Sequence, residues 1–439
     1  MPRSAYLILL LFLIFSVAAR LWLEKPKTLP RNVDLKLEAT LKIEPKIYET
    51  GQVISVADAK IYTGLYPRYR IGDRLRISGK INDSGKMFQP KVEKIAEDLG
   101  FSAFRSRLRG KISSNISSIL GAREAALVSG AVIGVDNLGG QFRDELVKTG
   151  TIHVVVVSGQ NLMIVAGIFM ALAPYIGRRR SLVLASFAVF FYAFLAGFEP
   201  PVLRASIMVF ATTLAMFFGR QTNVVWILGV SALVIVFLFP QALFEVSFQL
   251  TFAATLGIVT LGKWLEVTFK GPVSRFLPAS AQPSQFFEPS RPSEPEALRS
   301  VGSPPTAATL KGLVLGTFVQ NAAIATSAYV FTAPIIIFYF GRISPVAPLA
   351  NVLVAEAVFP MMVLGFLTAI LSLIFMPLAQ LVAYFAFVPA FYFSEVVRFF
   401  AALPFSQYSF GEGNIIFAGG CYFVLFAIIT LVRRKATSH

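Results

Sequence analysis

The spacing of apolar residues divides the chain into two parts. Between Leu37 and Ala96, apolar and polar residues alternate, which is typical of β-strands with one buried face. From Ile152 onward, long apolar runs recur, most of them close to the roughly 17 to 25 residues that a helix needs to cross a bilayer. The pattern predicts a small β domain followed by a bundle of membrane-spanning helices.

The alternating part predicts four or five short strands within residues 25–98. Turn-forming residues collect between the stretches, at Gly72-Asp73 and from Asn82 to Gly85. The alternating stretches are Leu37–Tyr48, Gly51–Tyr62, Arg74–Ile81 and Met87–Ala96. Several short strands in so small a segment favour a small β-barrel of the OB type.

The apolar runs predict about ten spans, some broken or re-entrant, and therefore a polytopic α-helical membrane protein. Nine candidates lie within residues 123–439: Ile152–Ala173, Leu182–Gly197, Val202–Phe218, Val224–Phe239, Leu243–Leu261, Leu313–Phe331, Val346–Phe375 (interrupted by Pro360), Leu378–Phe400 and Asn414–Val432. A tenth lies in residues 1–24, which we expect to be an uncleaved anchor; a signal peptide cut after Ala19 is the alternative. The run from Ala125 to Val135 is too short to cross and is expected to be re-entrant or interfacial.

Two further segments follow neither pattern. In residues 99–122, apolar residues recur at three- and four-residue spacing, with Arg105, Arg107, Arg109 and Lys111 between them. This arrangement is typical of an amphipathic helix on an anionic membrane surface, and packing on the β domain is the alternative. Residues at about 271–309 are rich in Pro and Ser and predict a flexible cytoplasmic loop.

The distribution of charged residues indicates a class of partner and an orientation in the membrane. The chain has 40 Lys and Arg against 24 Asp and Glu, and this excess indicates anionic partners, either lipid headgroups or nucleic acid. Between Arg20 and Arg123, 21 basic residues face 11 acidic ones, so the excess surrounds the β domain. The basic loops, among them Arg178 to Arg180, lie inside if both termini are cytoplasmic. The sequence therefore predicts a multi-pass protein of the inner (cytoplasmic) cell membrane with an extracytoplasmic β domain.

The residue inventory excludes several kinds of chemistry. Only 15% of residues are charged, against about 25% in ordinary soluble domains. His153 and His439 are the two histidines, too few for a multi-histidine metal site. The segment from Gly257 to Trp264 has Walker-like spacing, but Trp264 stands where Ser or Thr must hold Mg²⁺. We therefore expect no enzyme activity, no metal and no cofactor.

Polar side chains within the spans are the candidate functional residues, because they are costly in a bilayer. They form four clusters: His153, Ser158, Gln160 and Asn161; Glu199 and Arg204; Glu245, Ser247 and Gln249; and Gln320 and Asn321, followed by Asn351 and Glu356. Each residue also has a purely structural explanation, since polar side chains in membrane bundles often only tie helices together.

These clusters lie in segments that resemble the ComEC family, the DNA-internalisation channel of natural competence. GTIHVVVVSGQNL is similar to a Gly-x-x-His segment of that family that continues into Ser-Gly, and PPVLRASIM is similar to its Arg-Ala segment. VSFQLTFAATLGI and the stretch from Ser344 to Asn351 resemble two further segments, in the same order, over about Glu124 to Ala369. Many family members have His at the position of Asn161 and Pro at that of Glu356.

The resemblance implies a channel that passes single-stranded DNA into the cytoplasm during natural transformation. It also implies a form without the metallo-β-lactamase-like domain of fuller members, so a separate nuclease is expected. A separate cytoplasmic motor ATPase and an extracytoplasmic DNA receptor are the other expected partners, besides membrane lipids.

A basic, aromatic β domain suits DNA binding, because it neutralises phosphates and stacks on bases. The candidate DNA-binding residues are Tyr62, Tyr66, Arg68, Tyr69, Arg70, Arg74, Arg76, Lys80 and Phe88. We expect at least two of the aromatic residues in this domain to belong to its core instead.

Two other functions remain open from the residues alone. A secondary transporter of a small anion would also use broken helices and buried polar groups. A membrane-embedded enzyme acting on an envelope polymer would use His153 with Glu199 or Glu245 as acid and base.

Overall fold

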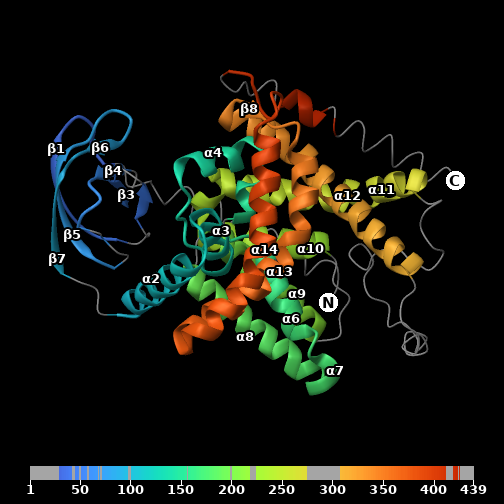
Figure 1. The fold of residues 1–439 in the computed structure, drawn as a ribbon. Helices are drawn as coiled ribbons and strands as arrows, with labels where there is room; N and C mark the ends of the chain where they lie inside the picture. The colour runs from blue at the N-terminus through green and yellow to red at the C-terminus, as the bar shows by residue number, and fades with distance from the viewer. Residues whose placement is uncertain are drawn as a thin grey trace, which may run out of the picture.

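The computed structural model describes residues 29–41, 45–48, 51–56, 59–67, 69, 72–96, 100–155, 157–197, 200–217, 224–273, 307–411, 419–423 and 425 (Figure 1). The expected anchor in residues 1–24 lies outside the described residues. So do nearly all of the expected cytoplasmic loop and most of the candidate span Asn414–Val432.

The N-terminal β module contains two sheets. One sheet has the order β1 (Asp34–Thr40), β5 (Arg74–Lys80) and β7 (Lys91–Ala96), with antiparallel neighbours. The other has the order β2 (Lys46–Tyr48), β3 (Gly51–Val56), β4 (Ala59–Thr63) and β6 (Lys86–Phe88), and its β4–β6 pair is parallel. The described strands do not close into one barrel, so the expected OB-type barrel is not confirmed.

Alternation along the strands builds the core of this module. Ile54 and Ile61 of one sheet and Leu75 and Ile77 of the other are completely buried. Their neighbours along each strand point outward, because successive side chains of a strand lie on opposite faces. The module therefore has an apolar centre between its sheets and two polar outer surfaces.

The remainder of the described chain is almost entirely helical. Its helices are α2 (Phe101–Ile119), α3 (Ala122–Ile133), α4 (Gly140–Lys148), α5 (Ile152–Val155), α6 (Gly159–Met170), α7 (Ala173–Ile176), α8 (Arg178–Ala196), α9 (Pro200–Phe217), α10 (Val224–Leu238), η1 (Pro240–Phe244), α11 (Val246–Val273), α12 (Ala307–Phe340), α13 (Ala347–Ile374) and α14 (Met376–Ala401). Two short strands, β8 (Arg342–Ile343) and β9 (Tyr408–Ser409), pair with each other.

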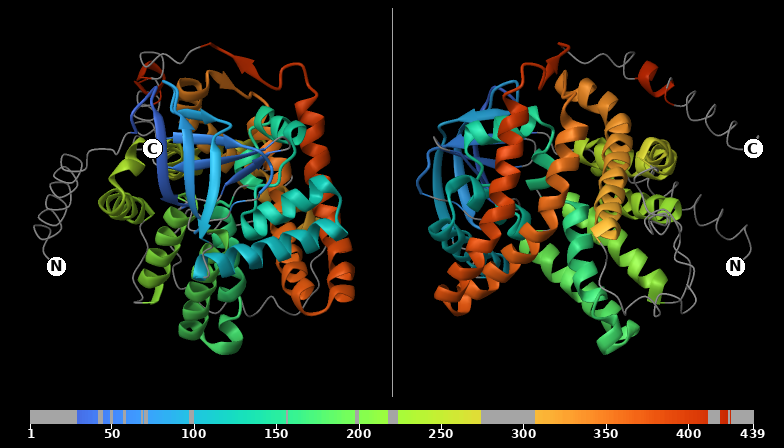
Figure 2. Two further views of the ribbon diagram at one scale, coloured as in Figure 1. Left: turned by 90° about the vertical axis from the view of Figure 1, so that its left-hand side faces the viewer. Right: turned by 45° about the vertical axis from the view of Figure 1, so that its right-hand side comes forward.

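Six of the helical segments found in the described ranges are long and apolar enough to cross a membrane. They are Gly159–Ile176, Arg178–Ala196, Val246–Lys270, Leu315–Phe340, Ala347–Ile374 and Met376–Ala401. Val202–Leu214 and Val224–Leu238 are shorter apolar helices at two further positions where the sequence predicts spans. In Figure 2, α7 and the turn between α13 and α14 lie at one end of the helical part, and β8 and β9 lie at the other.

The expected interruption at Pro360 is not found, because α13 continues through it. A proline removes one backbone donor, which a helix packed among others tolerates. The candidate span Ile152–Ala173 is broken, because α5 ends at Val155 and α6 begins at Gly159.

Helix α2 packs one face on the helical bundle, and its place on a membrane surface remains a prediction. Ile112 and Ile116 are buried in the main apolar core, which α2 shares with α3, α6, α8, α13 and α14. Two of its expected surface cations are buried as well, since Arg105 and Arg109 keep only 7% and 3% of their surface. Arg109 donates to the backbone oxygen of Gly134, at the end of α3, at 2.6 Å.

Candidate functional site

The first polar cluster lies at the break between α5 and α6. Ser158 is extended and precedes α6, and its hydroxyl donates to the Asn161 side-chain oxygen at 3.2 Å. Asn161 is completely buried and donates to the backbone oxygen of Ala131 at 3.3 Å. The Tyr192 hydroxyl donates to the same oxygen at 2.5 Å. Asn161 therefore ties α6 to α3 and does not face an aqueous path in this conformation.

His153 and Gln160 of the same cluster keep exposed side chains. The imidazole Nδ1 of His153 lies 3.0 Å from the backbone oxygen of Gly150. Both side chains therefore lie at the surface of the helical bundle, unlike Asn161.

A glycine lets α3 approach this break closely. A Cβ at Gly130 would lie 2.7 Å from the backbone oxygen of Val155, so any larger residue would push α5 away from α3. A Cβ at Gly159, the first residue of α6, would lie 3.5 Å from the Cβ of Ala205. The first cluster therefore adjoins α9 next to Arg204.

The second and third clusters join into one site between α9 and α11. Arg204 donates through Nη2 to the Ser247 hydroxyl at 2.8 Å, to the Ser247 backbone oxygen at 3.0 Å and to the Thr251 hydroxyl at 3.2 Å. Its guanidinium carbon lies 5.8 Å from the centre of the Phe248 ring. Residues predicted in separate clusters thus meet around one buried cation.

The charge of Arg204 is incompletely paired. Its side chain is 1% exposed, and its acidic neighbour Glu245 is 43% exposed and lies 4.0 Å from Nη1. Among the described residues, neither Nε nor Nη1 of Arg204 has a hydrogen-bond partner. Glu199 lies outside the described residues. Gln249 donates to the backbone oxygen of Leu243 at 3.2 Å and takes no part in the site.

The fourth cluster is brought together in part. Asn321 of α12 donates to a carboxylate oxygen of Glu356 of α13 at 2.6 Å. Gln320 and Asn351 are half-buried, and the side-chain oxygen of Asn351 has no hydrogen-bond partner within the described ranges. An amide and a carboxylate therefore link two of the long apolar helices.

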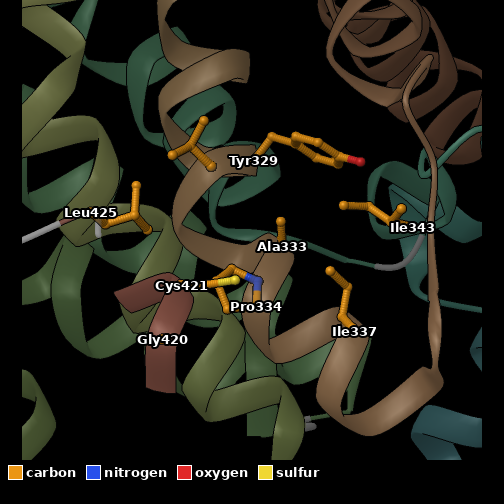
Figure 3. Close-up of a pocket in the computed structure, with 9 residues that line it drawn as sticks. Tyr329, Ala333, Pro334, Ile337, Ile343, Gly420, Cys421 and Leu425 are labelled. Atoms are coloured by element: carbon orange, nitrogen blue, oxygen red, sulfur yellow. The ribbon is translucent and has the colours of Figure 1, made fainter. Parts of the chain in front are cut away.

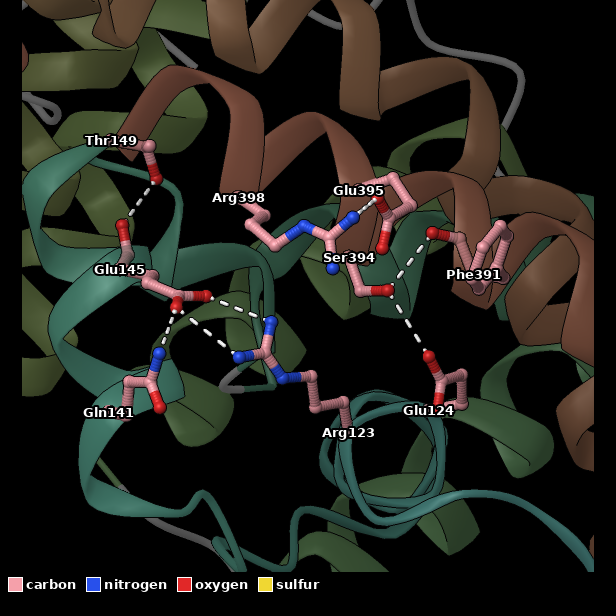
Figure 4. A network of polar contacts seen from close by, with 9 residues as sticks. All are labelled: Arg123, Glu124, Gln141, Glu145, Thr149, Phe391, Ser394, Glu395 and Arg398. Atoms are coloured by element: carbon pink, nitrogen blue, oxygen red, sulfur yellow. Dashed lines mark hydrogen bonds and ion pairs between the residues drawn. The ribbon is translucent and has the colours of Figure 1, made fainter. Parts of the chain in front are cut away.

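Sequence reasoning missed a polar network between α3, α4 and α14 (Figure 4). Arg123 forms two hydrogen bonds with Glu145, at 3.1 and 3.3 Å. Glu124 is buried and accepts a hydrogen bond from the Ser394 hydroxyl at 3.2 Å. The sequence signal for this network was the Arg123-Glu124 pair directly before an apolar run. Charged residues at such a position lie at the end of a buried helix.

Among the DNA-binding candidates, Tyr62 and Phe88 lie together. Their rings stack with centres 5.0 Å apart and planes at 19°. Phe88 is 61% exposed, and Tyr66 is 73% exposed. Tyr69 belongs to the core with 5% exposure, so its assignment to a DNA-binding surface is wrong. Its hydroxyl donates to the backbone oxygen of Val92 instead.

The cationic candidates differ in their pairing. Arg74 and Arg76 both contact Glu38, at 3.2 and 2.7 Å. The hydrogen bond from Arg76 lowers the pKa of Glu38 below its usual value. Lys80 is exposed, and Arg68 and Arg70 lie outside the described residues.

An apolar cavity of about 640 Å³ lies between α12 and the segment that contains Cys421 (Figure 3). Tyr329, Pro334 and Ile343 contribute to its wall. None of the described residues that line it is charged, so it does not suit a polyanion. Elsewhere, the described residues hold no group of three or more His, Cys, Asp or Glu side chains that could bind a metal ion.

Long apolar helices that enclose polar clusters, together with a separate β module, define a multi-pass helical membrane protein. A family model described as "Competence protein" matches residues 135–435, which is more than half of the chain. The chain belongs to this competence protein family, and the resemblance seen in its polar segments is confirmed.

A curated relative adds no function. The chain is 34% identical over 131 residues to an uncharacterized protein of Aquifex aeolicus (strain VF5). The matched segment is 30% of this chain and 31% of that relative. No solved structure shows significant similarity to the chain.

Proposed function

We propose that this protein is a channel that passes single-stranded DNA into the cytoplasm. Membership of the competence protein family supports this function, and one structural observation carries it: Arg204 is buried between membrane helices with an incompletely paired charge. DNA offers a continuous series of negative charges that can complement such a group.

Arg204 is an expensive residue for a purely structural role. A buried cation needs a close counter-charge and satisfied donors to offset its loss of hydration. Ser247 and Thr251 supply only neutral acceptors, and all three of their hydrogen bonds use the same nitrogen, Nη2. A phosphate that takes the place of these acceptors would use the free donors as well.

The structure then corresponds to a closed channel. Arg204 and Asn161 are buried, so DNA can reach them only if helices separate. Separation of α9 from α11 breaks neutral hydrogen bonds, which a passing phosphate group can replace. Glu245, which is already exposed beside Arg204, holds the cation when no DNA is present.

The proposal includes the expected topology. Ten spans result from the six long helical segments, the two shorter apolar helices and the two segments outside the described residues. The β module then acts as an extracytoplasmic, OB-like cap on a channel in the cytoplasmic membrane. Both termini are cytoplasmic in this arrangement.

Import against the membrane potential requires partners. Each phosphate that crosses the whole field toward a negative interior costs about 2.3 kcal/mol per 100 mV. A separate cytoplasmic motor ATPase supplies this energy in our proposal and docks on the basic inner loops. A separate receptor delivers DNA, and a separate nuclease removes the other strand.

A gene deletion tests the function. Cells that lack the protein should bind labelled DNA at their surface but show none in the cytoplasm, and the intact gene should restore uptake. Unchanged cytoplasmic label would overturn the proposal. Purified protein in liposomes distinguishes the alternatives, because transport of a small anion, or consumption of an envelope polymer without a motor, would identify a different class of protein.

A further inference from the structure

One outer surface of the β module combines aromatic rings with lysines. The parallel pairing of β4 with β6 places Lys60 beside Lys86 and Tyr62 beside Phe88. Ile61 and Met87, the residues between them, are completely buried, so the four paired residues lie on the outer face. We call Lys60, Tyr62, Lys86 and Phe88 the β4–β6 face.

The backbone fixes this face at both of its ends. The amide of Lys60 donates to the oxygen of Gly85 at 2.9 Å, and the amide of Gln89 donates to the oxygen of Tyr62 at 2.9 Å. The two aromatic rings are therefore presented by neighbouring, hydrogen-bonded strands. The two rings stack nearly parallel to each other, and this arrangement leaves Phe88 61% exposed.

The charge of the β4–β6 face is not compensated within its own strands. β3, β4 and β6 contain no Asp or Glu, and both lysines of the face are exposed. The opposite sheet differs, because Arg74 and Arg76 contact Glu38 and Lys91 contacts Glu93. Among the described residues, neither lysine of the β4–β6 face forms an ion pair, whereas most basic residues of the other sheet do.

We propose that the β4–β6 face binds single-stranded DNA, with Lys60 and Lys86 on phosphates and with Phe88, backed by Tyr62, stacking on a base. This site rests on the proposed function and names the surface that first holds the strand. A single strand fits better than a duplex, because its bases are free to stack on an aromatic ring. A surface of lysines and aromatic rings can also contact an anionic membrane. The binding experiments with vesicles of anionic lipid distinguish this alternative from DNA binding.

The test measures binding of a labelled oligothymidylate to the full-length protein in detergent. Phe88→Leu keeps an apolar side chain but removes the ring, and it should weaken binding by about 5- to 150-fold, the range that one stacked base represents. Phe88→Tyr should bind like the wild type. Binding of a duplex should be unchanged in both variants.

Lysine pairs provide a matched charge control. Lys60→Ala with Lys86→Ala should lower the slope of log affinity against log salt by about 1.4, because two phosphate contacts are lost. Lys36→Ala with Lys91→Ala removes the same charge from the exposed surface of the opposite sheet and should leave that slope unchanged.

Three results would overturn the inference. The first is wild-type affinity for the oligonucleotide in Phe88→Leu. The second is an equal loss of salt dependence in the two lysine pairs. The third is that variants of the β4–β6 face bind vesicles of anionic lipid more weakly but bind the oligonucleotide as the wild type does. Failure of the channel function is detected separately, because binding to purified protein does not depend on DNA uptake by cells.

Discussion

The guanidinium of Arg204 on α9 donates to the hydroxyl of Ser247 on α11 at 2.8 Å. This contact joins two segments whose polar residues looked independent in the sequence. It also fixes a permanently charged group between apolar helices, with Glu245 at 4.0 Å as the nearest acid that contacts it among the described residues.

Substitution of Arg204 should separate stability from function. Arg204→Met has a similar length without charge, and replacement of a buried ion by an apolar residue is often neutral or stabilising by about 1 to 4 kcal/mol. We expect membrane insertion and thermal stability to be retained while DNA uptake is lost. Arg107→Met, at an exposed position of α2, is the control. Normal uptake by the Arg204 variant would remove this residue from the route.

The shared acceptor at Ala131 predicts non-additive substitutions. Tyr192 and Asn161 both donate to this oxygen, so either donor alone can satisfy it. Tyr192→Phe and Asn161→Ala should each cost about 1 kcal/mol of unfolding free energy, and the double variant should cost more than their sum. Thermal unfolding in detergent of the wild type, the two single variants and the double variant measures this double-mutant cycle. Strictly additive effects would contradict the shared acceptor at Ala131.

The close approach of α3 to α5 predicts opposite effects at two helical glycines. Gly130→Ala places a methyl group 2.7 Å from the backbone oxygen of Val155 and should cost about 1 to 3 kcal/mol. Gly167→Ala has no atom within 4 Å of the new methyl group and should be neutral or stabilise the helix by up to about 1 kcal/mol. Equal melting temperatures of the two variants would refute this packing.

The ion pair between Glu38 and Arg76 predicts that the stability of the β module depends on pH. Because Arg76 lowers the pKa of Glu38 below its usual value of 4.5, the ion pair stabilises the module fully above that pH. This contribution should disappear as the pH falls through the lowered pKa. Hydrogen exchange of β1 and β5 in the full chain should therefore accelerate relative to the other sheet on acidification. In Glu38→Gln, acidification should no longer accelerate hydrogen exchange of β1 and β5 relative to the other sheet.

Cysteine labelling tests the proposed orientation. Cys421 is the one cysteine of the chain, so Cys421→Ser provides a cysteine-free background. In that background, Lys36→Cys should react with a membrane-impermeant maleimide added to intact cells. Arg179→Cys should react only after the membrane is opened. The reverse pattern would place the β module in the cytoplasm.

Apolar periodicity predicted the positions of the six long apolar helices in the described ranges, because a bilayer requires long apolar runs. It could not predict which polar residues meet. Arg204 and Ser247 are 43 positions apart, and their contact depends on how α9 packs on α11. The same limit applies to Arg105 and Arg109, whose burial depends on helices from elsewhere in the chain.

In the β module, alternation showed that each strand has two faces but not how the strands pair. The parallel β4–β6 pair arises from distant segments, and it separates the exposed Phe88 from Tyr69 in the core. Composition alone had placed both aromatic residues in the same group.

The hydrogen bond between Glu124 and Ser394 joins residues 270 positions apart. A ribosome adds about 5 to 20 residues per second, so the partner of Glu124 emerges roughly 15 to 55 s later. During that interval the carboxylate must remain hydrated or be held by the insertion machinery. Assembly of α3 into the bundle is therefore expected to be among the last steps of biogenesis, after the closing helices have left the translocon.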